Sequence, residues 1–567
     1  MSDQEKQEWS EDLKDYVDEW NELPKFMTRG GPGDHEFELS LLDGKVDSSQ
    51  WFQDQLNPEN SYNYNPDVLD KGTIGQQAKD QEIFFCDIPF NQLYVEMDGS
   101  YAACCFGAKA DGRNGLPKHT VKDTTLQHWM EESTYMNEIR AEMLDPNSKF
   151  ETTKKTCKRC ISDEKRYGRS RRTACMKIHT NEPDYWKMIE QSAQMFKATG
   201  QYVMEHRMIE VQLKVYGDEC NLDCYMCMHD NSSIRQKVAN EGVWNDSIFG
   251  NSAWKRDQDI DVQYFQPDEQ DIKDGISVKA KIPLSKNASS HFTNGNITGN
   301  NVESMIEQTL SMSKYIRSIK IIGGEPLIMK KHYELLQRLI DKDEAKHIII
   351  KYQTNLTETK AGKHNIFNYI PHFNLVCMVA SVDGVGKTIE YMRRRTDWKK
   401  VIKNTEYCRR YDNVNVDFNG LVSFLSVMRF YEVIDFCLDN PIIDQINWAL
   451  LEMPIHLRVN NLPEKIKKDL LPKYAAWPDI QAALSLPNDP GIDMQEVFDY
   501  MLDADKYYKG TKWEMNLFEV FPELEEFYIP KHKRKLQVVE ATEKVYTNQG
   551  ERELIDMLTL VEPTEKY

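Results

Sequence analysis

Between residues 208 and 460, short apolar runs rich in β-branched residues alternate with longer amphipathic segments. The apolar runs predict strands, at 209–215, 316–322, 347–352, 375–380, 414–422 and 445–450. The amphipathic segments predict helices, near 302–315, 330–342, 386–410 and 428–439. Strands that alternate with helices indicate βα units on a parallel sheet, and hence the α/β class. Six such units predict a partial (β/α)6 barrel, with functional residues at the carboxyl ends of its strands.

The rest of the chain divides into regions of different character. Residues 1–80 form an acidic extension, in which Trp9, Leu13, Tyr16 and Trp20 recur at helical spacing and predict a short amphipathic helix. Residues 81–178 hold six of the twelve cysteines and predict a small, separate α+β module, followed by a connecting helix at 179–207. An insertion at about 230–300, rich in Asn, Ser and Gly, interrupts the core. Residues 461–567 predict a helical C-terminal region, which we expect to shape a substrate pocket together with the insertion.

Composition narrows the classes of partner. The formal net charge is -20, which argues against a nucleic-acid partner because phosphate binding needs concentrated Lys and Arg. The first residues, MSDQEKQEWSEDLKDY, lack the basic and apolar segments of a signal peptide. No run approaches the ~18 apolar residues of a membrane span. We therefore expect a cytoplasmic protein without membrane contacts. In a reducing cytosol, its clustered cysteines are expected to bind metal rather than to form disulfides.

Three cysteines follow the first predicted strand of the core. Cys220, Cys224 and Cys227 are separated by three residues and then by two. Three thiolates on one short loop can hold three irons of a cubane cluster and leave the fourth iron open. A structural zinc site needs four ligands, and His229 is available as the fourth. The spacing alone leaves both kinds of site open.

In its context this spacing resembles the signature of the radical S-adenosylmethionine (SAM) superfamily, and the resemblance covers about residues 208–460. The second strand ends in Gly323-Gly324-Glu325-Pro326, similar to the GGEP motif that binds the amino group of the SAM methionine in that family. A carboxylate suits an ammonium group, and glycines allow a close approach of the backbone. The later strand ends and the following helix also match, at Thr354-Asn355, Ser381-Val382-Asp383-Gly384, Tyr391-Met392-Arg393 and Trp398.

The resemblance implies a barrel of the TIM-like, radical SAM type that holds a 4Fe-4S cluster on Cys220, Cys224 and Cys227. It implies that SAM is reductively cleaved to a 5′-deoxyadenosyl radical, which abstracts a substrate hydrogen. The electron would come from a flavodoxin or a ferredoxin. For Arg393, pairing with the SAM carboxylate and a solvated helix charge are both open. The residues implied to contact SAM are Tyr225, Gly323, Gly324, Glu325, Pro326, Asn355, Ser381, Asp383 and Arg393.

A second set of cysteines lies in the module at 81–178. The segment CDIPFNQLYVEMDGSYAACC resembles the start of a SPASM or twitch domain, with a hairpin turning at Asp98-Gly99. Such domains hold an auxiliary 4Fe-4S cluster, although in most relatives they follow the barrel rather than precede it. Zinc or a rubredoxin-like iron also suits four thiolates. The predicted ligands are Cys86, Cys104, Cys157 and Cys160, with Cys105 or Cys175 as a substitute for one of them.

The family resemblance implies an oxidoreductase or maturase that modifies a peptide or protein. The alternative enzyme acts on a small molecule, a sugar or a nucleotide, and a zinc-binding interaction protein is the alternative of another class. The basic segment GRSRRTAC predicts a solvated turn rather than a grip on an acidic substrate. Cys377, Cys408 and Cys437 are predicted to be buried structural cysteines. A solvated helix face is predicted for Lys387, Arg393, Arg394, Arg395, Lys399 and Lys400.

Overall fold

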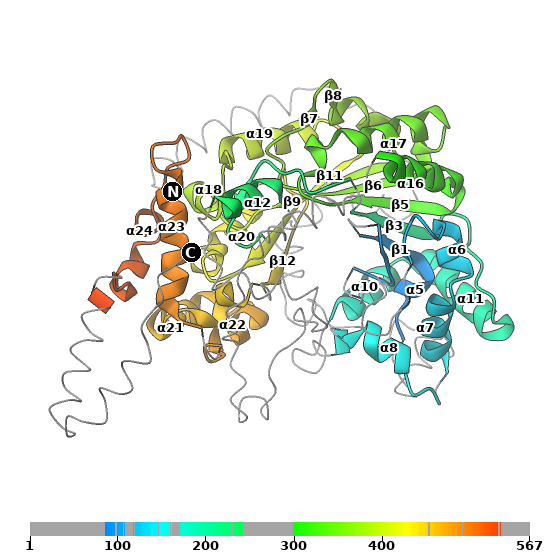
Figure 1. Ribbon diagram of the computed structural model, residues 1–567, viewed down its shortest axis with the longest axis horizontal. Helices are drawn as coiled ribbons and strands as arrows, with labels where there is room; N and C mark the ends of the chain where they lie inside the picture. The colour runs from blue at the N-terminus through cyan, green and yellow to red at the C-terminus, as the bar shows by residue number, and fades with distance from the viewer. Residues whose placement is uncertain are drawn as a thin grey trace, which may run out of the picture.

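The computed structural model describes residues 85–534 of the chain (Figure 1). Within that span the description leaves out residues 97–98, 106, 108–116, 118, 146, 159, 162–169, 215, 228–231, 242–298, 452–453, 490–491 and 531–532. The acidic extension with its predicted helix near Trp9, and almost all of the predicted insertion, therefore lie outside the described residues.

An eight-stranded, mostly parallel sheet organises the described residues. Its strands are, in spatial order, β12 (Gln445–Leu450), β11 (Val414–Val422), β9 (Leu375–Ser381), β6 (Ile349–Thr354), β5 (Ile316–Ile321), β3 (Ile209–Leu213), β1 (Gln92–Val95) and β2 (Tyr101–Ala102). The first six are the predicted strands of the core, and β2 alone is antiparallel to its neighbour. Because β12 and β2 are the two edges, the sheet is open within the described part of the chain.

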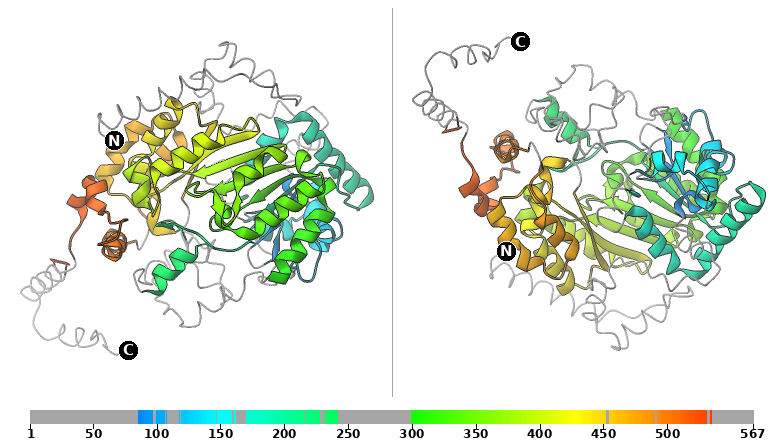
Figure 2. Two further views of the ribbon diagram at one scale, coloured as in Figure 1. Left: turned by 90° about the horizontal axis from the view of Figure 1, so that it is seen from above. Right: turned by 90° about the horizontal axis from the view of Figure 1, so that it is seen from below.

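The two faces of the sheet differ in polarity. One face is apolar and fully buried, with side chains such as Val211, Ile319 and Met378. Alternate residues on the same strands, including Gln212 and Lys320, are half-buried and point to the other face. The helices α16 (Gly299–Ser311), α17 (Lys330–Asp341) and α19 (Trp398–Cys408) lie along one side of the sheet in Figures 1 and 2. The helix predicted near 428–439 is α20 (Phe430–Asp439).

The single helix predicted at 386–410 is wrong. The segment folds as α18 (Lys387–Met392), the two-residue strand β10 (Arg393–Arg394) and then α19. Arg395 has a φ of 80°, which a continuous right-handed helix excludes. The helix ends because β10 pairs with β4 (Asp223–Cys224) in an antiparallel ladder. Arg393 and Arg394 consequently point into the protein, so the predicted solvated face is wrong for these two residues.

The cysteine-rich module is joined to the core through the sheet. Residues 92–95 of β1 pair in parallel with residues 210–213 of β3, and β1 and β2 form the predicted hairpin, with Gly99 at a φ of 81°. The module therefore precedes the core in sequence but extends the same sheet in space. Its helices are α5 (Ile88–Asn91), α6 (Leu126–Glu131), α7 (Thr134–Leu144), α8 (Glu151–Thr156) and α10 (Arg171–Thr180), and the predicted connecting helix is α11 (Pro183–Thr199).

The C-terminal part of the described chain is helical, as predicted. It contains α21 (Glu464–Leu470), α22 (Pro478–Ser485), α23 (Met494–Tyr508) and the short α24 (Leu517–Val520). Figure 1 shows these helices beyond the β12 edge of the sheet, opposite the cysteine-rich module. Within the described residues, no helix combines the length and the apolar character that crossing a membrane requires.

Candidate functional site

The residues predicted to act together lie at one edge of the sheet. The loop with Cys220, Cys224 and Cys227 follows β3, and Gly323 to Pro326 follow β5. Asn355 follows β6, and Asp383 follows the end of β9. Because these strands are parallel, their carboxyl ends meet at the same edge of the sheet. The tertiary structure therefore brings the four segments together.

The two glycines of the GGEP segment pack directly against the loop that leads to Cys220. The backbone N–H of Glu325 donates to the carbonyl of Glu219 at 2.7 Å, and that of Gly324 donates to the carbonyl of Gly217 at 3.4 Å. A β-carbon on Gly324 would lie 2.3 Å from the Glu219 oxygen. This close approach is possible only because residue 324 lacks a side chain.

The Glu325 carboxylate connects the ends of β5 and β6. It is fully buried and accepts hydrogen bonds from Thr354 Oγ1 at 2.6 Å, from Asn355 N at 2.6 Å and from Leu327 N at 3.1 Å. Burial raises the pKa of Glu325 to about 7. Both carboxylate oxygens are thus engaged within the protein, and contact of this segment with a SAM amino group stays a prediction.

Asn221 ties the cysteine loop to the end of β6. Its Oδ1 accepts a hydrogen bond from Asn355 Nδ2 at 2.9 Å, and its Nδ2 donates to Thr357 Oγ1 at 2.7 Å. Asn355, a predicted SAM contact, therefore holds the loop between Cys220 and Cys224. The sequence analysis did not single out Asn221, although its place within the cysteine spacing was an available signal.

A buried guanidinium links Cys224 to the end of β9. Arg393 donates to both Asp383 oxygens, at 2.7 and 3.1 Å, and its Nη1 lies 3.8 Å from Cys224 Sγ. Asp383 also accepts a hydrogen bond from Leu421 N at 2.7 Å. Burial raises the pKa of the Cys224 thiol to about 11, and the positive charge of Arg393 opposes that rise. Arg393 is therefore a counter-ion beside the three-cysteine loop rather than a solvated charge.

Two other predicted contacts have different surroundings. Ser381 is half-buried on the polar face of the sheet, where its Oγ accepts a hydrogen bond from Gln353 Nε2 at 3.1 Å. The Tyr225 ring is buried and stacks on Tyr391, with ring centroids 5.2 Å apart. Its hydroxyl lies 3.3 Å from Asp505 Oδ1, so this side chain faces the C-terminal helices.

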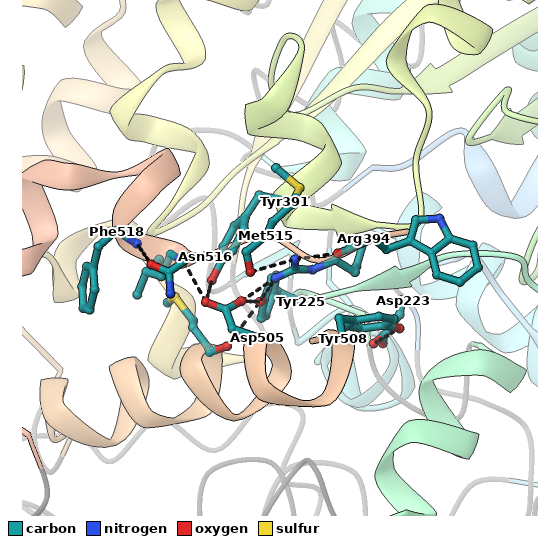
Figure 3. A network of polar contacts seen from close by, with 12 residues as sticks. Asp223, Tyr225, Tyr391, Arg394, Asp505, Tyr508, Met515, Asn516 and Phe518 are labelled. Carbon is teal, nitrogen blue, oxygen red and sulfur yellow. Dashed lines mark hydrogen bonds and ion pairs between the residues drawn. The ribbon is translucent and has the colours of Figure 1, made fainter. Parts of the chain in front are cut away.

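The C-terminal helix α23 forms hydrogen bonds with the residues on both sides of Cys224, Asp223 and Tyr225 (Figure 3). Tyr508 donates to Asp223 Oδ2 at 2.9 Å, and Arg235 pairs with Asp223 Oδ1 at 3.0 Å. Asp505 forms a buried ion pair with Arg394, which also donates to the Tyr225 hydroxyl at 3.0 Å. We call Asp505, Tyr508 and Arg394 the C-terminal clasp. The sequence analysis missed the clasp, because no local pattern links Asp505 to a loop that precedes it by some 280 residues.

The four cysteines predicted to hold the auxiliary site surround one cavity. Its lining consists of Cys86, Ile88, Cys104, Gly107, Cys157, Cys160 and Arg172. The Cys86 thiol is buried, and the nearby Cys157 and Cys104 add to the effect of burial in raising its pKa. The suggested substitutes, Cys105 and Cys175, are not among the lining residues. The structure therefore brings the four first-choice cysteines to one place.

Neither cysteine set is closed around a single ion. Among the described residues, no three His, Cys, Asp or Glu side chains are arranged to hold one metal ion. His229, the fourth ligand of the zinc alternative, lies outside those residues. Comparisons with protein-family models and with curated proteins find no match for this chain. The residues of the two cysteine sets and their surroundings are therefore the basis for assigning a function.

The contact between the GGEP segment and the cysteine loop can be tested with Gly324→Ala. The added methyl group would lie 2.3 Å from the Glu219 carbonyl oxygen and 2.5 Å from that of Asp218. Both are backbone atoms, so relieving the clash requires a shift of the main chain. We expect a loss of about 2–4 kcal/mol in the free energy of unfolding, and loss of iron from the three-cysteine loop. The matched control is Gly200→Ala, which meets nothing within 4 Å and bears only the cost of its φ of 72°. Urea denaturation and iron analysis of both variants check this result.

Proposed function

We propose that this protein is a radical SAM enzyme of the oxidoreductase or maturase type, built on a partial TIM-like (β/α)6 barrel. One observation carries the proposal. The loop with Cys220, Cys224 and Cys227 follows the first core strand and is hydrogen-bonded to the GGEP segment after the second. The two motifs, about a hundred residues apart, meet at the strand ends where active sites form, and this supports the proposal.

The residues present suit a 4Fe-4S cluster with one open iron. The loop offers three thiols, and Arg393 next to it balances negative charge. Cys220, Cys224 and Cys227 would hold the cluster. When bound, such a cluster supplies one electron to SAM, which yields a 5′-deoxyadenosyl radical that removes a hydrogen atom from the substrate. A flavodoxin or ferredoxin is the proposed electron donor.

The chain's own residues position the loop. Glu325 and Asn221 fix the loop against β5 and β6, and Arg393 fixes Cys224 against Asp383. Burial raises the pKa of Cys220 to about 12, so its thiol is protonated near neutral pH when no metal is bound. Metal binding at this loop must therefore release protons.

The cavity lined by Cys86, Cys104, Cys157 and Cys160 is the proposed site of an auxiliary 4Fe-4S cluster. Four thiols leave no open iron, which favours electron transfer or a structural role over substrate binding there. The strand pairing of β1 with β3 supports a functional connection, because it attaches this module to the strand that leads to Cys220. By analogy with SPASM and twitch enzymes, the proposed substrate is a peptide or protein. Radical modification of a small molecule, sugar or nucleotide is the second candidate.

Anaerobic reconstitution tests the proposal directly. We expect about eight iron and eight sulfide atoms per chain, a brown colour with absorbance near 400 nm, and 5′-deoxyadenosine when SAM and dithionite are added. Zinc without iron or sulfide after anaerobic purification would instead establish a zinc-binding interaction protein. Clusters that form without any cleavage of SAM would contradict the radical SAM assignment.

A further inference from the structure

A row of polar side chains crosses the open face of the sheet at the level of Lys320. Register pairs Tyr94 with Gln212, Gln212 with Lys320, Lys320 with Lys351, and Lys351 with Cys377. Parallel strands covered on both faces are almost continuously apolar. The polar row, most of it half-buried, therefore indicates a face that meets water or a bound molecule.

One positive charge in this row is already neutralised. Lys351 Nζ lies 3.1 Å from Glu210 Oε1, and Gln92 Nε2 donates to Glu210 Oε2 at 3.2 Å. Lys320 is the neighbour of Lys351 on β5 and is also half-buried. Neither the Lys320 amine nor the Gln212 amide forms a hydrogen bond with any other described residue. Two adjacent donors are thus left without a partner within the described part of the protein.

Arg171 adds a positive charge from α10, the helix whose His179 Nε2 lies 3.9 Å from Glu210 Oε2. It is the first residue of α10, which Ser170 caps, and its Nε is buried without a hydrogen-bond partner among the described residues. Burial lowers the pKa of Lys320 to about 8, and the charges of Arg171 and Lys351 contribute to that shift. Repulsion between Arg171 and Lys320 would be relieved by an anion placed between them. The solvated turn predicted for GRSRRTAC is therefore wrong at Arg171.

We propose that Lys320, Arg171 and Gln212 form an anion-binding subsite that receives a carboxylate of the substrate. This inference rests on the proposed function and specifies its substrate as one that carries an acidic group. Lys320 precedes Gly323 by three residues, so the subsite lies about 10 Å along the sheet from the GGEP segment. A substrate held there by its carboxylate can extend towards the three-cysteine loop. The subsite offers one guanidinium, one ammonium and one amide, so we assign it to a single carboxylate, with inorganic phosphate as the competing anion.

Calorimetric titration of the reconstituted full-length protein, without SAM and at constant ionic strength, tests the subsite. The probes are glutarate and inorganic phosphate. We expect glutarate to bind the wild-type protein more tightly than phosphate does, and Lys320→Gln and Arg171→Gln each to weaken glutarate binding at least tenfold. Lys320→Arg keeps the charge and should retain most of the affinity. Lys346→Gln is the matched control, because Lys346 is exposed and pairs with Asp343 away from the sheet.

The outcomes separate this inference from the radical SAM proposal. Wild-type protein that binds neither anion, or a Lys320→Gln variant that binds glutarate as well as the wild type, would overturn the subsite. Tighter binding of phosphate than of glutarate would overturn the carboxylate assignment. Absorbance near 400 nm per chain, measured for each variant, shows whether the clusters are intact. The titration contains no SAM, so a failure of anion binding does not affect the separate test of 5′-deoxyadenosine formation.

Discussion

Replacing Cys224 with alanine is expected to remove about four iron atoms per chain and to abolish 5′-deoxyadenosine formation, while the auxiliary cluster remains. Cys224 is the central cysteine of the loop, and its sulfur lies 3.8 Å from Arg393 Nη1. With two thiols left, the loop cannot hold three irons of a cubane. Iron and sulfide analysis, electron paramagnetic resonance of the reduced protein and chromatographic detection of 5′-deoxyadenosine measure the effect.

Two further cysteine variants make this result specific. Cys408→Ala also removes a buried thiol, but from α19, where it lines neither site, so both clusters and SAM cleavage should persist. Cys157→Ala should remove the other cluster, because Cys157 lines the cavity of the cysteine-rich module. A Cys224→Ala protein that still cleaves SAM would show that the ligand assignment is wrong.

Asp505→Ala is expected to lower the free energy of unfolding by about 3–5 kcal/mol. The substitution leaves Arg394, whose side chain is 1% exposed, as a buried charge without its ion-pair partner. It also removes the acceptor for Leu517 N, at 2.7 Å, and for the Tyr225 hydroxyl. Because Asp505 and Arg394 both bond the hydroxyl of Tyr225, which follows Cys224 in the loop, iron occupancy of the three-cysteine loop should fall as well. Urea denaturation and iron analysis measure the two effects.

A surface ion pair supplies the control for the clasp. Lys346→Ala breaks the exposed pair with Asp343, and little or no loss of stability is expected. The double variant Arg394→Met with Asp505→Leu should regain part of the lost stability, since no buried charge is then left unpaired. If Asp505→Ala unfolds like Lys346→Ala and retains all of its iron, the clasp does not position the cysteine loop.

Local sequence was sufficient for the strands and for the cysteine sets. The six core strands appear where apolar runs rich in β-branched residues predicted them. Along each strand, side chains alternate between the two faces of the sheet. That same alternation carried a signal that the prediction did not use. Glu210, Gln212, Lys320 and Lys351 interrupt strands that would be wholly apolar if both faces of the sheet were covered.

Long-range contacts decided the features that the sequence analysis got wrong or missed. The positive charges of Arg393 and Arg394 suggested a solvated helix, but each arginine is buried against a carboxylate from a distant segment, Asp383 or Asp505. The cysteine-rich module seemed separate because its composition differs, whereas β1 joins β3 through backbone hydrogen bonds that any residues can make.

By itself, the sequence determined the strands, the spacing of the two cysteine sets and the order of the motifs, since each depends on neighbouring residues. Only the tertiary structure decided that Glu325 and Asn221 hold the cysteine loop, that α23 clasps it, and that Arg171 lies near Lys320. Those partners are far apart along the chain, and a charge or an amide does not specify which distant group will satisfy it. Burial in the folded protein determines the partner, because a polar group removed from water is stabilised only by a hydrogen bond or ion pair within the protein.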